Sequence, residues 1–113
     1  MGSMDDILRR SLLFDFYGEL LTEHQKEVYE AFDSDDMSLS EIAEEYGISR
    51  QGVHDLIKRT NHTLEMYEEK LGLVDRFMAM RETLKEIDVI ASEMYTPDGD
   101  RISSLVEILL DEI

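Results

Sequence analysis

The sequence predicts an all-α protein of about six helices, built as a helix-turn-helix with a long second helix and a C-terminal helical extension. Three observations predict this class. Apolar residues recur at steps of three and four along most of the chain, strand-like alternation is almost absent, and the few Gly and Pro residues stand at breaks between periodic segments. Because 113 residues suffice for one core, we expect a single helical domain over residues 4–113.

The chain begins with Met1-Gly2-Ser3 before a second methionine, Met4, so residues 1–3 are interpreted as an expression remnant. No apolar run is long enough to cross a bilayer and no secretory signal is recognisable, which predicts a cytoplasmic protein without membrane insertion. The absence of cysteine excludes disulfides, zinc–thiolate sites and thiol nucleophiles.

The net charge is strongly negative, −16, from 27 Asp and Glu against 11 Lys and Arg. Nucleic-acid-binding domains usually present a basic surface to the phosphates, so any such contact must be local here. Residues 49–62 are the exception, since they hold three Lys and Arg and only one Asp. The acidic remainder also has a simpler explanation, because like charges keep small proteins soluble and apart.

The first helix is expected from about Asp5 to Leu21, with acidic residues in its first turn. Thr22 and Gln25 then form a capping box that begins a second helix, which ends in the acidic run 33–36. The apolar set of the first helix is Ile7, Leu13, Phe14, Tyr17, Leu20 and Leu21, and that of the second is Val28, Tyr29 and Phe32.

Ser38 and Glu41 form another capping box, which begins a short third helix that stops at Gly47. Ser49 caps a fourth helix of roughly 20 residues, about 30 Å long, which ends at Gly72. The apolar positions of this helix are Val53, Leu56, Ile57, Thr60, Leu64, Tyr67 and Leu71.

The C-terminal helices, 73–113, begin with the most regular pattern of the chain. Its apolar seam, with steps of four and three over three heptads, is Leu73, Phe77, Met80, Leu84, Ile87, Ala91 and Met94. The seam either closes the core against the first and last helices or pairs with another copy or a partner helix, and the two uses are compatible. After a turn at 96–100, a final helix has the apolar face Ile102, Leu105, Val106, Leu109 and Ile113.

Residues 39–58 meet the demands of a helix-turn-helix, in which a tight turn holds two helices at a fixed angle. Counted from Leu39, the fourth, eighth, tenth, fifteenth and eighteenth positions must be apolar, and they are Ile42, Tyr46, Ile48, Val53 and Leu56. The fifth position must be small and is Ala43, and the ninth must form the turn and is Gly47. Units of similar geometry also occur in proteins that bind no nucleic acid.

The outward residues of the second motif helix are the candidate nucleic-acid ligands: Ser49, Arg50, Gln51, His54, Lys58 and Arg59. Arg50 can pair with guanine and Gln51 with adenine. Lys58 or His54 can reach a phosphate or a base edge. Gly52 would permit close backbone approach. The alternative is a solvated helix face. Asp55 opposes groove binding unless it accepts from cytosine or pairs with Arg59, which can itself be structural.

The run SLSEIAEEYGISRQ (38–51), with Val53 and IKR (57–59), resembles the helix-turn-helix of sigma-factor region four. With FDFY (14–17), LLT (20–22), the acidic turn before Ser38 and LEMYEEKL (64–71), the chain is similar to the YlxM family of small bacterial proteins over residues 12–110. The resemblance implies an all-helical cytoplasmic DNA-binding regulator whose gene lies beside those of the signal recognition particle. The link to that pathway is thus implied by gene position.

Other chemistry has little support. Asp33, Asp35 and Glu44 match a calcium loop, but Met37 and Ser38 replace its fifth ligand and its glycine. The three histidines lack metal-ligand spacing, and no phosphate loop, nucleophile elbow or HExxH motif occurs. We therefore expect no metal, no cofactor and no enzyme.

The expected partners are DNA, or RNA, and a second copy, since helix-turn-helix proteins usually double their contacts by dimerising. The alternative function is a non-catalytic adaptor that binds signal recognition particle components through the helix over 73–94.

Overall fold

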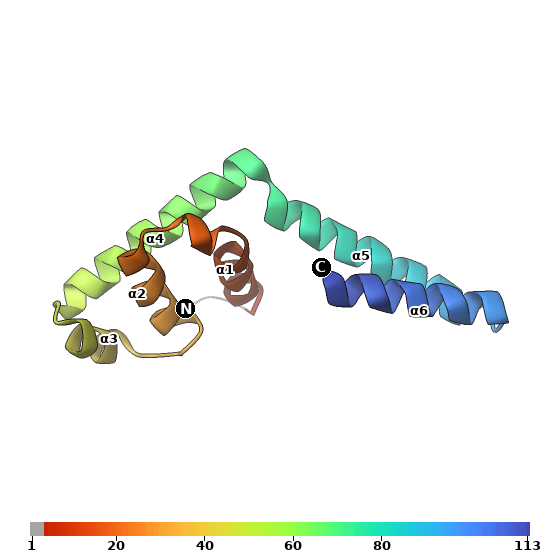
Figure 1. Cartoon of the computed structure of the whole chain (residues 1–113), viewed down its shortest axis with the longest axis horizontal. Helices are drawn as coiled ribbons and strands as arrows, with labels where there is room; N and C mark the ends of the chain where they lie inside the picture. Colours follow the sequence, from red (N-terminus) through yellow and green to blue (C-terminus); the bar gives the residue numbers. More distant parts are fainter. Residues whose placement is uncertain (1–3) are drawn as a thin grey trace. The chain divides into compact units, whose positions relative to one another are not determined.

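The computed structural model describes residues 4–113, and the expected expression remnant at 1–3 lies outside them. That range is built from α-helices with one short 3-10 helix and contains no strand, which confirms the all-α class. The elements in Figure 1 are α1 (Met4–Tyr17), η1 (Gly18–Leu20), α2 (Glu23–Asp33), α3 (Leu39–Tyr46), α4 (Arg50–Leu71), α5 (Leu73–Ser92) and α6 (Pro97–Glu112).

The contacts of the chain gather into two compact units, one reaching to Val74 and the other running over Asp75–Ile113. The sequence predicted a single domain over 4–113 with helices 73–113 as its C-terminal part. The division has a physical reason, because the core cluster of the first unit ends at Val74, whereas Ala91 is buried against Gly99 of its own unit.

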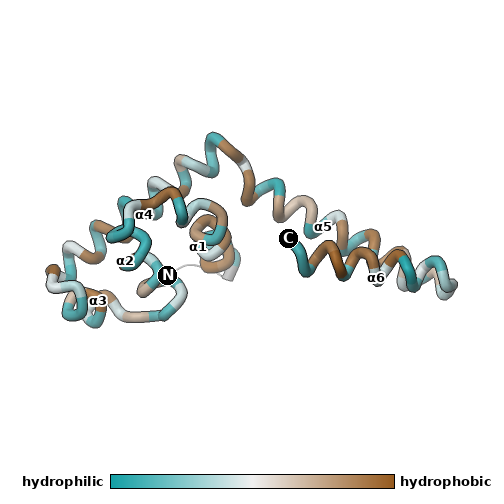
Figure 2. The backbone as a smooth tube through the Cα atoms, in the orientation of Figure 1, coloured by the Kyte–Doolittle hydropathy of each residue, from teal (hydrophilic) through white to brown (hydrophobic). Residues whose placement is uncertain are grey.

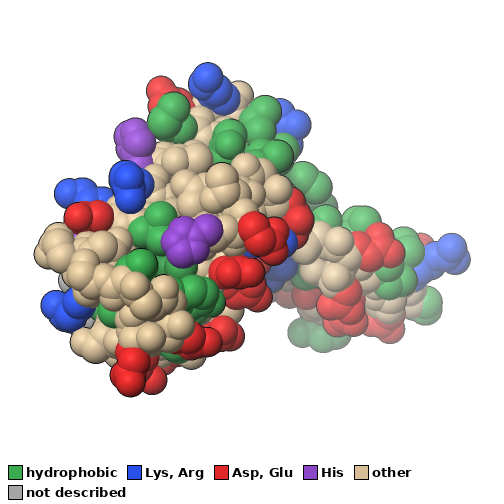
Figure 3. Space-filling view, turned by 60° about the vertical axis from the view of Figure 1, so that its left-hand side comes forward, with side chains coloured by type: hydrophobic (Ala, Val, Ile, Leu, Met, Phe, Trp, Pro, Cys, Tyr) green, Lys and Arg blue, Asp and Glu red, His purple; other side chains and the backbone are tan. Residues whose placement is uncertain are grey.

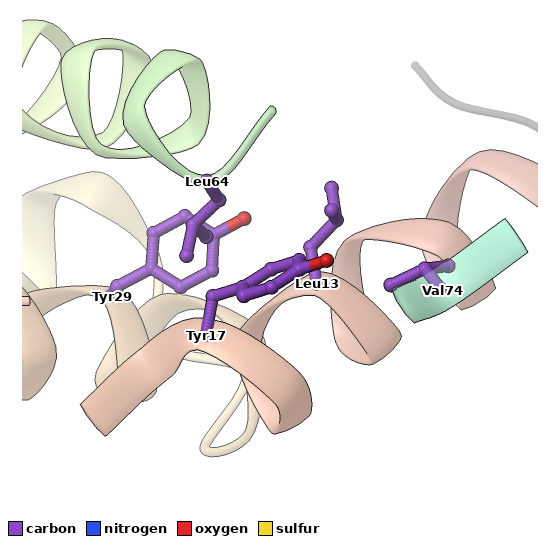
Figure 4. Close-up of a cluster of buried hydrophobic side chains, with 5 residues drawn as sticks. All are labelled: Leu13, Tyr17, Tyr29, Leu64 and Val74. Carbon is purple, nitrogen blue, oxygen red and sulfur yellow. The ribbon is translucent and has the colours of Figure 1, made fainter. Parts of the chain in front are cut away.

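Two clusters of buried side chains hold the first unit together. The cluster in Figure 4 joins α1, α2, α4 and the first turn of α5 through Leu13, Tyr17, Tyr29, Leu64 and Val74. The other joins α2, α3 and α4 through Val28, Ala31, Ile42 and Val53. Along each helix, hydrophobic positions alternate with hydrophilic ones at helical spacing (Figure 2), so each helix has one face to bury. Removal of these faces from water is the main stabilising term.

A buried polar network lies where α4 ends and α5 begins. The Tyr17 hydroxyl donates to Glu68 Oε1 at 2.6 Å, and the same oxygen accepts from the Val74 N–H at 2.9 Å. The Tyr17 hydroxyl also accepts from the Leu73 N–H at 3.1 Å. First-turn N–H groups have no partner within their helix. The network therefore supplies the N-terminal cap of α5 from side chains of α1 and α4.

The first helix ends earlier than the sequence predicts. Instead of continuing to Leu21, α1 stops at Tyr17 and η1 follows. The Phe14 ring covers Gly18 so closely that a Cβ there would lie 3.2 Å from Phe14 Cε1. Leu20, expected on the buried face, is exposed because the tighter turn of a 3-10 helix moves it off that face. Ile7, expected with it, is exposed as well.

The second unit is an antiparallel pair formed by most of α5 with α6 (Figure 1). Thr96 caps α6 by accepting from the Gly99 N–H at 3.0 Å, with Pro97 in the first turn. A Cβ on Gly99 would lie 2.6 Å from the Ala91 carbonyl oxygen, so the two helices touch closely here. Much of the predicted seam of α5 is nevertheless exposed, at Met80, Ile87 and Met94. No helix within residues 4–113 is both long and apolar enough to cross a membrane.

Candidate nucleic-acid interface

The α3 helix is capped at both of its ends. Ser38 Oγ accepts from the Glu41 N–H and the Glu41 side chain accepts from the Ser38 N–H, both at 3.1 Å. At the other end Gly47 adopts the left-handed conformation with φ 66°, and the Ala43 carbonyl accepts from the N–H groups of Gly47 and Ile48. Glycine is favoured here because a side chain strains a left-handed backbone.

The side chains predicted to hold the motif together are Ile42, Ala43, Ile48, Val53 and Leu56, and all belong to the cluster between α2, α3 and α4. Ile42 and Val53 are completely buried, while the other three pack against them half-buried. The angle between α3 and α4 is therefore set by core packing rather than by surface contacts.

The α4 helix begins with a cap made by its own Ser49. The Ser49 hydroxyl accepts from the Gly52 N–H at 2.9 Å, and a Cβ on Gly52 would stand 3.1 Å from that hydroxyl oxygen. The missing side chain at Gly52 thus leaves room for the cap, a role that the sequence did not indicate. Since the Ser49 hydroxyl serves the helix, it is a less available ligand than the residues that follow it.

The remaining predicted ligands, Arg50, Gln51, His54, Lys58 and Arg59, are all exposed on α4. At about 100° per residue, His54, Lys58 and Gln51 fall within an arc of about 60°, and Arg50 borders it at the start of the helix. Figure 3 shows Lys, Arg and His side chains at the upper left of the helix-turn-helix end, with most carboxylates below them. The structure therefore places Arg50, Gln51, His54 and Lys58 on one side of α4, whereas Arg59 lies about 80° further round the helix.

Asp55 is the carboxylate nearest to this surface. It accepts from Gln51 Nε2 at 3.1 Å and lies 3.5 Å from His54 Nδ1. Arg59 turns to the Asp55 backbone carbonyl at 3.4 Å, so the side-chain pairing considered from the sequence is not formed. Among residues 4–113, neither Arg50 nor Lys58 makes an ion pair with a carboxylate of the chain. Two full positive charges are therefore available to a ligand.

A pocket of about 270 Å³ lies beside Lys58 and His54 and extends to Arg10 of α1. Arg10 lies over the Phe32 ring at 4.9 Å and is held by Asp33 at 2.7 Å. The other lining residues are Tyr29, Leu39, Ile57 and Asn61. Sequence reasoning missed Arg10, because nothing in the helical period of α1 indicates that it reaches the motif.

Tyr29 closes the inner side of this pocket. Its hydroxyl donates to Asn61 Oδ1 at 3.0 Å, and burial raises the pKa of Tyr29 above its ordinary value of 10.0. The hydroxyl therefore remains a neutral donor, and the lining contains cations and hydrogen-bond donors but no carboxylate.

The two capped helices, their tight turn and the exposed basic side of the second helix define a helix-turn-helix protein. Comparison with known proteins agrees. Residues 4–98 match the family UPF0122, described as "Putative helix-turn-helix protein, YlxM / p13 like", and the chain belongs to this family.

Relatives from several bacteria support the assignment. The chain is 44% identical over 107 residues to the UPF0122 protein YlxM of Bacillus subtilis, covering 95% of this chain and 96% of that protein. A UPF0122 protein of Caldanaerobacter subterraneus is 51% identical over 83 residues, which are 74% of this chain and 71% of that protein. One from Thermoanaerobacter sp. is 43% identical over 113 residues, with 96% and 94% covered.

Proposed function

We propose that the protein is a non-enzymatic, nucleic-acid-binding regulator that inserts the N-terminal half of α4 into the major groove of DNA. The observation that carries the proposal is the exposure of Arg50 and Lys58 on one side of α4, without ion pairs to the carboxylates of an otherwise acidic chain. The proposed ligand set is Ser49, Arg50, Gln51, His54, Lys58 and Arg59.

The roles follow from position along the helix. Arg50 and Gln51, in the first turn, are placed to reach base edges, where a guanidinium pairs with guanine and an amide with adenine. Lys58, two turns later, suits a backbone phosphate as a point charge. Asp55 holds Gln51 in the free protein, so binding to adenine would require exchange of that hydrogen bond.

The test is titration of a mixed-sequence DNA duplex and of a structured RNA at a series of low salt concentrations. Arg50→Ala and Lys58→Ala are each expected to weaken binding. Lys58→Ala should also reduce the salt slope by about 1, because it removes one phosphate-directed cation, whereas Arg50→Ala should relax the preference for guanine. Lys70→Ala is the matched control, since it removes the same charge from the far end of α4. Equal losses in all three variants would point to net charge alone, and flat titrations with both ligands would refute the proposal.

We also propose that the protein acts as a homodimer, which would double the contacts of one motif. The connection to the signal recognition particle pathway is proposed on the family resemblance alone.

A second candidate function is an adaptor for signal recognition particle components. The exposed apolar residues along 73–94 favour it, because such positions suit a partner helix. A pull-down with purified signal recognition particle components separates the two functions. An adaptor would retain its partner when Arg50 and Lys58 are replaced together, and failure with every component would remove this candidate.

A further inference from the structure

Each helix of the second unit has one covered and one exposed row of side chains. On α5 the covered row is half-buried or buried and consists of Phe77, Arg81, Leu84, Asp88 and Ala91. The exposed apolar residues Met80, Ile87 and Ile90 each stand one position before a member of that row. On α6, Leu105 and Leu109 likewise precede the covered residues Val106 and Leu110.

This shared offset places the exposed rows together. One residue turns a helix by about 100°, in the same sense in every right-handed helix. Two antiparallel helices are related by a twofold axis that runs between them. Rows of side chains that are rotated by the same angle away from the contact between the helices therefore lie on the same side of the helix pair. The resulting surface, which we term the open face, consists of Met80, Ile87, Ile90, Leu105 and Leu109, exposed by 39–58%.

The second unit is too small to leave such a surface uncovered without consequence. It spans residues 75–113, below the roughly 40 residues under which a domain usually needs disulfides, a metal or oligomerisation. The chain has no cysteine, and no metal-ligating group of side chains gathers among the described residues. Burial of this surface against a second copy is a further device open to a unit of this size.

Charge favours a second copy as the partner. Most acidic residues of the second unit lie off the open face, whereas Asp98 and Glu112 border it at the two ends of α6. Between Arg76 and Ile90 the row on α5 carries no charge, and between Asp98 and Leu109 the row on α6 carries one charged residue, the cation Arg101. Two copies with a net charge of −16 each can therefore meet there with carboxylates only at the margins of the interface.

The ends of the open face also set an orientation. Arg76 stands four residues before Met80 in the same row, and Asp98 stands seven residues before Leu105. These opposite charges lie at opposite ends of the helix pair. We infer that two copies of the chain join through their open faces, antiparallel, as a four-helix bundle in which Arg76 of each copy meets Asp98 of the other. This adds the interface to the homodimer proposed above and does not depend on nucleic-acid binding.

The test is the molar mass of the full-length protein, measured by sedimentation at about 50 µM and on dilution. Wild type is expected to be a dimer. Ile87→Asp and Leu105→Asp, one on each helix, are each expected to weaken dimerisation by about 100-fold or more, because each places a carboxylate in an apolar interface.

Matched controls lie on the other side of the same unit. Met78 is 40% exposed, against 39% for Ile87, and Val89 is 56% exposed, against 52% for Leu105. The variants Met78→Asp and Val89→Asp should both remain dimeric. A monomeric wild type would overturn the inference, as would equal dissociation of the controls. Nucleic-acid titration of the same variants distinguishes the two proposals, since a monomer that still binds DNA refutes only the dimer.

A charge exchange tests the orientation. Arg76→Glu alone is expected to weaken the dimer, and Arg76→Glu combined with Asp98→Arg to restore it, because the pair is then re-formed with reversed signs. A double variant that is no tighter than the single one would exclude the antiparallel arrangement.

Discussion

The network at the start of α5 offers a sharp test of what holds the first unit together. Tyr17→Phe removes one oxygen and leaves the packing of the buried ring unchanged. It deletes the hydrogen bond to Glu68 and leaves the Leu73 N–H without its acceptor. No cavity is created, so the loss reports the polar interactions alone.

The magnitude follows from the geometry. At 2.6 Å, the Tyr17–Glu68 bond has the length of a charge-assisted O–H···O⁻ bond, which contributes about 1.5–3 kcal/mol. An unpaired backbone N–H adds about 1 kcal/mol where, as at Leu73, the residue is only half-buried. We therefore expect Tyr17→Phe to lower the free energy of unfolding of the first unit by about 2.5–4 kcal/mol.

Hydrogen exchange read by mass spectrometry reports the amides of α1 and α4 separately from those of the second unit. Tyr95→Phe is the control, because that side chain is 89% exposed and its hydroxyl faces solvent. The control should stay within about 0.5 kcal/mol of wild type. A Tyr17→Phe protein that is equally close to wild type would refute the network as a stabilising element.

Three further predictions concern caps and turns. The hydrogen bond from the Ser38 N–H lowers the pKa of Glu41 below its ordinary 4.5. This cap therefore stabilises α3 above pH 4.5, and the stabilisation is lost as the pH falls through the lowered pKa of Glu41. Glu41→Gln should abolish the acid transition of the Ser38 amide in an NMR titration. Gly99→Ala should destabilise the second unit by about 1–3 kcal/mol, seen as faster exchange in α6, because its Cβ would meet the Ala91 carbonyl. Tyr95 has φ 52°, so Tyr95→Gly should stabilise the same unit by about 1 kcal/mol in chemical denaturation, whereas Tyr95→Ala, which keeps the Cβ, should not.

Helix boundaries were largely predictable because their signals are local. The capping pairs at 22–25 and 38–41, and the glycines that end α3 and α4, stand in the sequence as they act in the structure. Gly18 is the exception. Its role depends on the Phe14 ring above it, and periodicity does not report such a contact.

Interactions between distant segments were not predictable. A buried acid such as Glu68 looks like any other acid in a chain that has 27 of them, and its partners Tyr17 and Val74 lie on other helices. The seam of α5 was visible as an apolar stripe, but the period does not say which flank a neighbour covers. At the candidate interface, the exposed basic residues followed from the motif, whereas Arg10 required the packing of α1.

The charge at the N-terminal half of α4 is opposite in sign to the net charge of the chain. A polyanion is repelled by the acidic parts of the surface, whereas Arg50 and Lys58, which pair with no carboxylate among the described residues, attract it. The association rate with a nucleic acid is therefore lower than for a protein that is basic all over. In return, encounters in the wrong orientation are brief, and little of the protein is lost to unproductive adsorption on the excess of phosphate in a cell.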